Sequence, residues 1–254
     1  MTALPAPETF LSGEHGTVGG RRGAVRRGAD RLLDLAARRT LRRVVRAPER
    51  EVLVAGIYRP PATPPALGSD RHRVRTRFAE MRPGRGKFEN LNDLVDAEAD
   101  WLVVIDDDVV LPAGFLDTFI DVCDQLELDL AQPAQTLASH AAWRVVRRRP
   151  FALARETRFV EIGPVTAFSR RAARELLPFP ALRYGWGLDL HWAAVAAERG
   201  WRLGIVDALA VRHEAAPVGA AYPAAAAIEE AQRFLAERPY LPSAAVGDVL
   251  AVHR

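Results

Sequence analysis

The sequence contains little cysteine, lysine or methionine, and it has no long apolar run. Its single cysteine, Cys123, cannot form a disulfide within the chain and indicates a reducing compartment. Met1 is not followed by a basic segment and an apolar core, so we expect no secretory signal. No uninterrupted apolar stretch reaches the ~18 residues that a bilayer span needs. We therefore expect a cytoplasmic protein, and we leave open a peripheral contact with the cytosolic face of a membrane.

Positive charge is carried almost wholly by arginine, since Lys87 is the only lysine. The net charge of +3 is small, and the basic excess lies mostly before residue 50. In residues 21–48, leucine and valine recur at helical spacing with arginine between them, which predicts a basic amphipathic helix. Such a helix either packs on the domain or touches an anionic membrane through residues 21–47. Its lack of aromatic residues favours packing and argues against nucleic-acid binding.

The remaining chain predicts one α/β domain between two tails. Residues 1–20 show no periodicity and are expected to be a disordered tail. Over residues 49–240, apolar runs such as Glu51–Tyr58 and Trp101–Ile105 alternate with helical patterns, which indicates an open α/β sheet with helices on both faces. Residues 241–254 are expected to be a C-terminal tail. We expect further strands at 74–81, 128–131, 159–168, 201–206 and 209–213, and helices at 88–97, 112–125, 170–177, 188–199 and 221–237.

Three aspartates, Asp106, Asp107 and Asp108, directly follow the strand WLVVI. Ligands of open α/β sheets bind at the carboxyl ends of strands. Adjacent carboxylates repel one another, and a divalent cation with oxygen ligands compensates that repulsion. The pattern favours Mg²⁺ or Mn²⁺, and a solvated acidic turn is the simpler alternative. His213 also ends a predicted strand and is a reasonable further ligand for Mn²⁺.

Two other segments carry candidate chemistry. In YGWGLDLHW, Asp189 stands at the start of a helix, where it either caps the helix or accepts a proton from a hydroxyl group. Trp186 could stack on a sugar, although a buried core tryptophan is more common. The loop around Gly86 and Lys87 opens a helix and is a plausible phosphate cradle, with an ordinary helix start as the alternative.

Together these motifs resemble the GT-A glycosyltransferases, and glycosyltransferase family 2 in particular. The matching segments are IDDD, GPVTAFSRR, Gly187-Leu188-Asp189 and GWRLGIVDALAVRH, and they follow the order of that family over residues 87–214. The segments FVEIGPVTAFSR and YGWGLDLHW are also similar to a group of glycosyltransferase-like proteins of plants and bacteria. The resemblance implies a GT-A, Rossmann-like open mixed sheet.

The resemblance also implies a function and a set of roles. The chain would transfer a sugar, with inversion, from a nucleotide-diphosphate donor to the hydroxyl of a glycan, a lipid-linked molecule or a small molecule, using Mn²⁺ or Mg²⁺. Asp108, His213 and Asp106 would hold the metal, and Asp189 would be the general base. The donor would be bound by Asp106, Asp107, Lys87, Asn90 and Asn92, and the acceptor by Glu161 and Trp186.

The sequence departs from the family in two places. An acidic residue usually precedes the base, and here Leu188 stands there. The first half is also short, so no pocket for the nucleotide base is identifiable. Two alternatives therefore stay open: a non-catalytic homologue that binds sugar or nucleotide, and a nucleotidyltransferase. The second would usually need an early glycine-rich loop, and residues 51–60 contain only Gly56.

Overall fold

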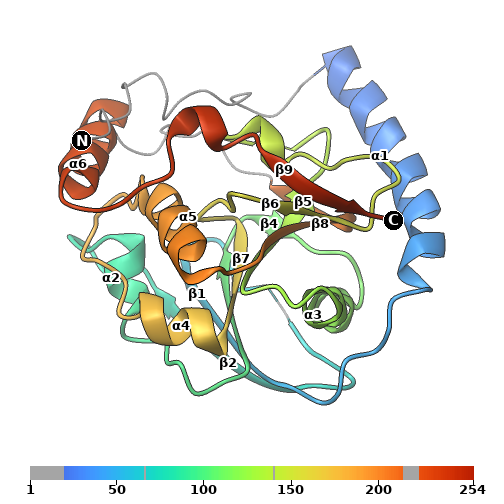
Figure 1. Cartoon of the computed structure of the whole chain (residues 1–254), viewed down its shortest axis with the longest axis horizontal. Helices are drawn as coiled ribbons and strands as arrows, with labels where there is room; N and C mark the ends of the chain where they lie inside the picture. The colour runs from blue at the N-terminus through green and yellow to red at the C-terminus, as the bar shows by residue number, and fades with distance from the viewer. Residues whose placement is uncertain (1–19, 66, 140, 214–222) are drawn as a thin grey trace.

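The structure, a computed structural model, describes residues 20–65, 67–139, 141–213 and 223–254. Residues 1–19, which make up nearly all of the expected tail, lie outside the described residues, as do the first residues of the helix expected at 221–237. Within the described ranges the chain is an α/β protein with a nine-stranded, open mixed sheet and an N-terminal helix (Figure 1).

The sheet has the strand order β2-β1-β3-β7-β5-β8-β6-β9, and β4 pairs with β8 outside this path. Strands β1, β2, β3, β5 and β8 share one direction, since β1 is parallel to β2 and β3, β5 is parallel to β8, and β7 is antiparallel to both β3 and β5. Their carboxyl ends therefore meet at one edge. The strands are β1 Glu51–Tyr58, β2 Arg73–Glu80, β3 Trp101–Asp106, β4 Val109–Val110, β5 Leu130–Gln135, β6 Ala154–Thr157, β7 Val165–Ser169, β8 Leu203–His213 and β9 Val249–His253.

Both faces of the sheet are covered. Along β1 and β3, successive residues enter two different hydrophobic clusters, as the two-residue period of a strand requires. One cluster contains Leu188 and Trp192 of α5, and the other contains Phe115 and Phe119 of α3. Helices therefore lie on both faces, as predicted. They are α1 Gly20–Leu41, α2 Lys87–Leu91, α3 Phe115–Gln125, α4 Arg170–Leu176, α5 Leu188–Arg199 and α6 Ala224–Ala236, with short 3₁₀ turns η2 Arg144–Val146 and η3 Ser243–Ala245.

Helix α1 confirms the predicted N-terminal helix, but it ends at Leu41 and not near residue 48. Polar groups hold it to the domain. The carboxylate of Asp30 accepts the backbone N–H groups of Leu137 at 2.9 Å and Ala138 at 3.1 Å. The buried guanidinium of Arg148 pairs with Asp30 at 3.4 Å and with Asp34 at 2.7 Å. The predicted apolar face packs only in part, because Leu41 contacts the cluster that contains α3 whereas Leu32 and Leu35 are exposed.

Several expectations about elements were wrong. The helix expected at 88–97 is the short α2, which ends at Leu91. Residues 201–206 and 209–213 were expected to be two strands, and they lie within the single strand β8. The expected C-terminal tail contains η3 and β9, which pairs with β6 at the sheet edge. Helix α3 begins at Phe115 after Gly114 and not at Pro112, and the strand expected over 159–168 begins only at Val165.

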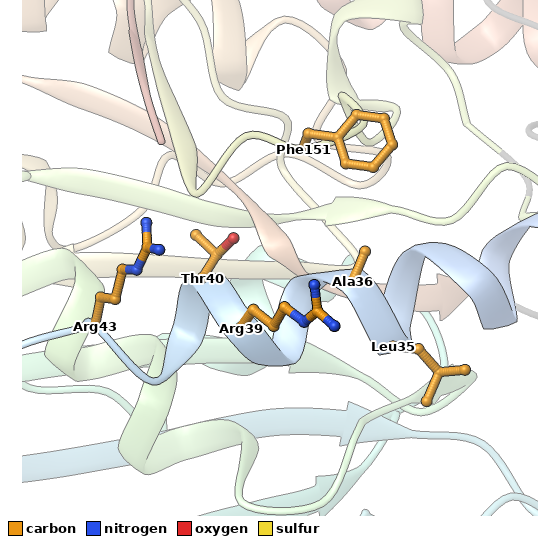
Figure 2. A pocket seen from close by; sticks show the side chains of 6 residues that line it. All are labelled: Leu35, Ala36, Arg39, Thr40, Arg43 and Phe151. Atoms are coloured by element: carbon orange, nitrogen blue, oxygen red, sulfur yellow. The ribbon is translucent and has the colours of Figure 1, made fainter.

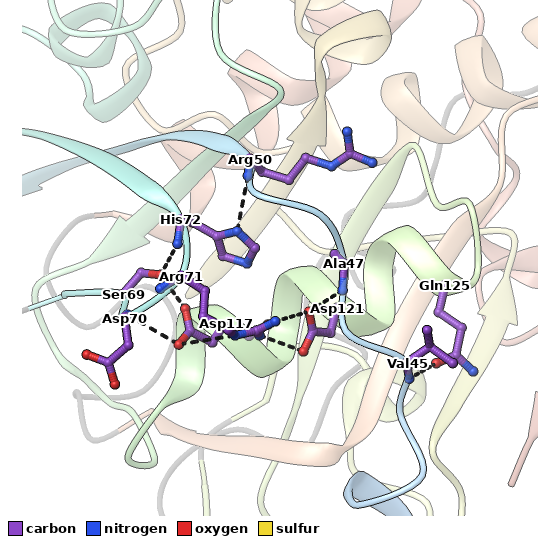
Figure 3. Close-up of polar contacts among 10 residues, drawn as sticks. All are labelled: Val45, Ala47, Arg50, Ser69, Asp70, Arg71, His72, Asp117, Asp121 and Gln125. Atoms are coloured by element: carbon purple, nitrogen blue, oxygen red, sulfur yellow. Dashed lines mark hydrogen bonds and ion pairs between the residues drawn. The ribbon is translucent and has the colours of Figure 1, made fainter.

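A polar network ties two loops to helix α3 (Figure 3). Arg71, in the loop before β2, pairs with Asp121 at 2.6 Å and donates to the carbonyl of Asp117 at 3.1 Å. Asp121 also accepts the backbone N–H of Ala47 at 2.8 Å, beyond the end of α1. The imidazole of His72 accepts the N–H of Arg50 at 3.2 Å, so this histidine is structural. The network fixes the segment that links α1 to the sheet.

Among the helices of the described ranges, none combines the length and the apolar composition that crossing a bilayer requires. The expected cytoplasmic location stays a prediction.

Candidate functional site

The shared carboxyl edge of the parallel strands brings the sequence-predicted metal ligands together. Asp106 is the last residue of β3, and His213 is the last residue of β8. The short strand β4 turns back after the aspartates and pairs with β8 in the register Val109↔His213. This pairing places Asp108 beside His213, although 105 residues separate them in the sequence.

Asp106, Asp108 and His213 form a group whose potential ligand atoms all lie within 4.8 Å of one another. The Nε2 atom of His213 is 3.1 Å from Oδ1 of Asp108. Burial works against the charge of Asp108, but the hydrogen bond and charge of His213, aided by Lys87, outweigh it and hold the pKa of Asp108 below its ordinary value. Two carboxylates and one imidazole thus converge with all three side chains half-buried.

Lys87 and Gly163 fix the position of Asp106. The ammonium group of Lys87 lies 2.5 Å from Oδ1 of Asp106 and also donates to the carbonyl of Ile162 at 3.4 Å. A Cβ atom on Gly163 would stand 2.8 Å from Oδ2 of Asp106, closer than real Cβ atoms approach. Only glycine at 163 lets the Asp106 carboxylate lie against this loop. The predicted Lys87 is therefore at the site, and Gly163 is a site residue that the sequence motif contained but did not explain.

Asp107 points elsewhere. Its Oδ2 atom accepts the backbone N–H of Arg59 at 2.8 Å, in the loop after β1. It is therefore not a member of the three-residue metal group, and its carboxylate orders a neighbouring loop.

Asn90 and Asn92 were expected near the donor, and both amides are engaged with the backbone. Asn90 accepts from the N–H of Arg82 at 3.2 Å and donates to the carbonyl of Gly86 at 2.8 Å. Asn92 donates to the carbonyl of Phe179 and accepts its N–H, each at 2.8 Å. Their hydrogen-bonding capacity serves the fold, so we leave both out of the proposed donor site.

Asp189 is buried at the start of α5, with only 7% of its surface exposed. Its Oδ1 atom accepts the backbone N–H of Leu190 at 2.9 Å, while Gly187 with φ +87° occupies the N-cap position. Burial raises the pKa of Asp189 to about 7, although backbone hydrogen bonds lower it. A carboxyl that titrates near neutral pH suits a general base.

Glu161 is a second buried carboxyl at this edge. Burial, and then the charges of Asp189 and Asp106, raise its pKa well above the ordinary value. Since both carboxylates act on Glu161, it lies within electrostatic reach of the predicted base and of the metal group. Its Oε2 accepts from Nε2 of Gln135 at 3.0 Å, and its backbone N–H donates to Oε1 of Gln132.

Those two glutamines were not predicted from the sequence. Each is fully buried on β5, and only one of its two amide atoms, the nitrogen of Gln135 or the oxygen of Gln132, is hydrogen-bonded to Glu161. Nε2 of Gln132 and Oε1 of Gln135 have no hydrogen-bond partner among the residues that the structure describes. An unsatisfied buried polar atom costs about 1–3 kcal/mol, so these two atoms are a sign of a polar partner that the chain itself does not supply.

Trp186 is buried in the hydrophobic cluster that also contains residues of α5 and α6. The structure places its ring in the core. This explains the residue without an acceptor, and we do not carry the predicted sugar-stacking role further.

A comparison of the chain with protein-family models finds no matching family, and a comparison with curated proteins finds no match. The functional argument therefore rests on the residues themselves.

Proposed function

We propose that this chain is a metal-dependent glycosyltransferase of the GT-A type, which moves a sugar from a nucleotide-diphosphate donor to an acceptor hydroxyl with inversion. The observation that carries the proposal is the convergence of Asp106, Asp108 and His213 at the carboxyl edge of the sheet. A buried carboxyl with a pKa of about 7, Asp189, starts a helix on the same domain and supports a reaction that needs a base.

The three side chains fit a hard divalent cation. Two carboxylate oxygens and one imidazole nitrogen suit Mn²⁺, and Mg²⁺ suits the oxygens. The buried Oδ1 of Asp108 faces Nε2 of His213 at 3.1 Å and has no other partner among the described residues. A bound dication would satisfy that oxygen and would supply charge neutralisation for the leaving diphosphate.

Lys87 and Asp189 would each have a separate role in the proposed reaction. Lys87, held 2.5 Å from Asp106, adds a fixed positive charge beside the metal group where phosphate oxygens would lie. The ionised carboxylate of Asp189 accepts the proton of the acceptor hydroxyl as that oxygen attacks the sugar. A single displacement of this kind inverts the configuration at the reacting carbon.

Glu161 and the two glutamines provide the proposed acceptor contact. The amide N–H of Gln132 and the carbonyl oxygen of Gln135 are buried beside Glu161, and neither has a hydrogen-bond partner among the described residues. Burial and the nearby charges of Asp189 and Asp106 raise the pKa of Glu161 well above its ordinary value, which favours the neutral form that can donate a hydrogen bond.

The test combines metal and donor. Mn²⁺ with a nucleoside diphosphate should raise the melting temperature of the wild-type chain, because a ligand that binds only the folded state stabilises it. Asp108→Ala should abolish the rise. Asp107→Ala removes the neighbouring carboxylate, which faces Arg59, and is the matched control that should retain the rise. The absence of any shift with the wild-type chain at saturating metal would overturn the proposal.

Product analysis separates the two alternatives. Release of a nucleoside diphosphate from a nucleotide sugar supports the transferase, and release of pyrophosphate from a triphosphate supports a nucleotidyltransferase. Binding of metal and nucleotide without turnover or donor hydrolysis across a broad donor panel would indicate a non-catalytic homologue.

A further inference from the structure

The outer face of helix α1 exposes apolar side chains that the domain does not cover. Val25, Leu32 and Leu35 are 72%, 70% and 56% exposed. At 100° per residue, these three positions fall within one sector of the helix, opposite the buried Gly23 and Asp30. The helix therefore packs through one side and presents a separate apolar stripe to the solvent.

The same outer face is strongly cationic. Residues 21–46 contain ten arginines and two acidic residues, Asp30 and Asp34. Both aspartates pair with Arg148 of the domain, so their negative charges are balanced by Arg148 and not by the exposed arginines. Nine of the ten arginines are exposed, namely Arg21, Arg22, Arg27, Arg31, Arg38, Arg39, Arg42, Arg43 and Arg46. Ten arginines less two aspartates give residues 21–46, which are α1 and the segment just after it, a net charge of +8 against +3 for the whole chain, so the rest of the chain is net acidic.

Phe151 adds an exposed aromatic ring beside this helix. It is 73% exposed and adopts φ +62°, a left-handed conformation that costs a bulky residue on the order of 1 kcal/mol. Together with Leu35, Ala36, Arg39, Thr40 and Arg43 it lines a shallow groove of about 480 Å³. Figure 2 shows the ring of Phe151 across the groove from the helix. A strained turn that holds an aromatic ring out in solvent indicates a contact with another surface.

Charge decides which surface fits. A second copy of the chain would set one arginine-rich helix against another, because a two-fold interface pairs each patch with itself. An anionic bilayer instead attracts each arginine by about 1 kcal/mol and receives the apolar stripe at its headgroup boundary. The ring of Phe151 supplies the aromatic contact that the helix sequence itself lacks.

We propose that the outer face of α1, formed by Val25, Leu32, Leu35 and the exposed arginines, docks together with Phe151 on an anionic phospholipid bilayer. The helix lies in the plane of the surface and does not cross it. Because Asp30 binds the N–H groups of residues 137 and 138, and Ser139 Oγ accepts the N–H of His213 at 2.8 Å, docking would hold the carboxyl edge of the sheet at a fixed position above the lipid.

Flotation of the full chain with vesicles tests this inference. Vesicles of phosphatidylcholine with 30% phosphatidylglycerol should carry the chain upward, and pure phosphatidylcholine vesicles should not. Arg39→Glu with Arg43→Glu should lower the partition coefficient at least tenfold, since two attractive contacts become repulsive. Phe151→Ser with Leu32→Ser, which leaves the charge unchanged, should lower it several-fold.

The control variant carries the same charge change on another face. Arg174→Glu with Arg233→Glu alters exposed arginines of α4 and α6, which lie far from α1 in Figure 1, and should keep most of the binding. Equal binding to both vesicle types, or equal loss in the control, would overturn the inference. The inference would also be overturned if the chain bound no vesicles and instead associated with itself, or bound a duplex oligonucleotide, in a way that Phe151→Ser abolishes. These readouts need no transferase activity, so they stand or fall independently of the proposed reaction.

Discussion

Replacing Asp189 by asparagine should stabilise the protein at alkaline pH while it removes the proposed base. Asparagine has almost the same shape, and its Oδ1 can still accept the N–H of Leu190. The substitution removes only the carboxyl group that can gain or lose a proton. The pKa of the Asp189 carboxyl is about 7 in the fold against an ordinary 3.8, so the folded chain holds a proton that the unfolded chain has released between these values.

The sign and size of the effect follow from that difference. Between pH 4 and pH 7 the folded state binds more protons than the unfolded state, so wild-type stability falls as pH rises. The penalty from Asp189 is about 2 kcal/mol at pH 5 and reaches roughly 4 kcal/mol at pH 8, at 1.36 kcal/mol per pH unit. The asparagine variant has no such penalty, so its stability relative to wild type should rise by roughly 2.5 kcal/mol between pH 5 and pH 8.

Urea unfolding of the metal-free chains at pH 5 and pH 8 measures this gain. Asp107→Asn makes the same chemical change at the half-buried neighbour of Arg59 and is the matched control, whose effect should not grow with pH in this way. If Asp189→Asn changes the free energy of unfolding equally at both pH values, the carboxyl is not buried with a raised pKa, and the argument for it as a base fails.

Three further predictions follow from the same contacts. For the wild-type chain, kcat/KM of the proposed sugar transfer should fall as the pH drops below about 7, since Asp189 must be ionised to accept a proton. A flat profile from pH 5 to 8 would contradict this. Gly163→Ala should weaken Mn²⁺ binding at least tenfold with little loss of stability, because the new Cβ would meet Oδ2 of Asp106 at 2.8 Å; calorimetric titration with Mn²⁺ measures it, and unchanged affinity would refute the role of the glycine. Arg148→Ala should lower the free energy of unfolding by roughly 3 kcal/mol, since it leaves Asp30 buried without its cation; an unchanged urea midpoint would show that α1 is held by other contacts.

Elements with strong local signals could be predicted from the sequence. The apolar runs of β1 and β3 need no partner to be recognised, and the same holds for the ends of two helices. Ser169 caps α4 by accepting the N–H of Ala172 at 3.3 Å, and Gly200 with φ +64° ends α5. Each of these signals lies within a few residues of the element it defines.

Features that depend on distant partners were missed or wrong. Residues 207 and 208 were left between two expected strands, yet Asp207 is buried inside β8, where its carboxylate pairs with Arg155 of β6 at 2.8 Å. Strand β9 is short and half-exposed, and only its pairing with β6 defines it. Asn90 looked like a phosphate contact because the sequence cannot show that its amide is already engaged with the backbone.

Some residues of the candidate site could likewise be predicted from the sequence, and others could not. Asp108 and His213 could be paired because each follows a strand, and parallel strands end at one edge. Gln132 and Gln135 could not be predicted as site residues, because Pro133 between them obscures the strand pattern of LAQPAQ. The pairing of this segment with β8 is itself irregular. Their partner Glu161 is 26 residues from Gln135 in the sequence.

Binding of Mn²⁺ to the chain, followed by electron paramagnetic resonance, tests the central claim most directly. One Mn²⁺ should bind per chain, and electron–nuclear double resonance should detect a directly bound nitrogen that His213→Ala removes. Asp108→Asn should weaken the binding at least a hundredfold, while Asp107→Asn leaves it unchanged. Wild-type affinity in both Asp108→Asn and His213→Ala would show that these residues do not hold a metal and would contradict the account.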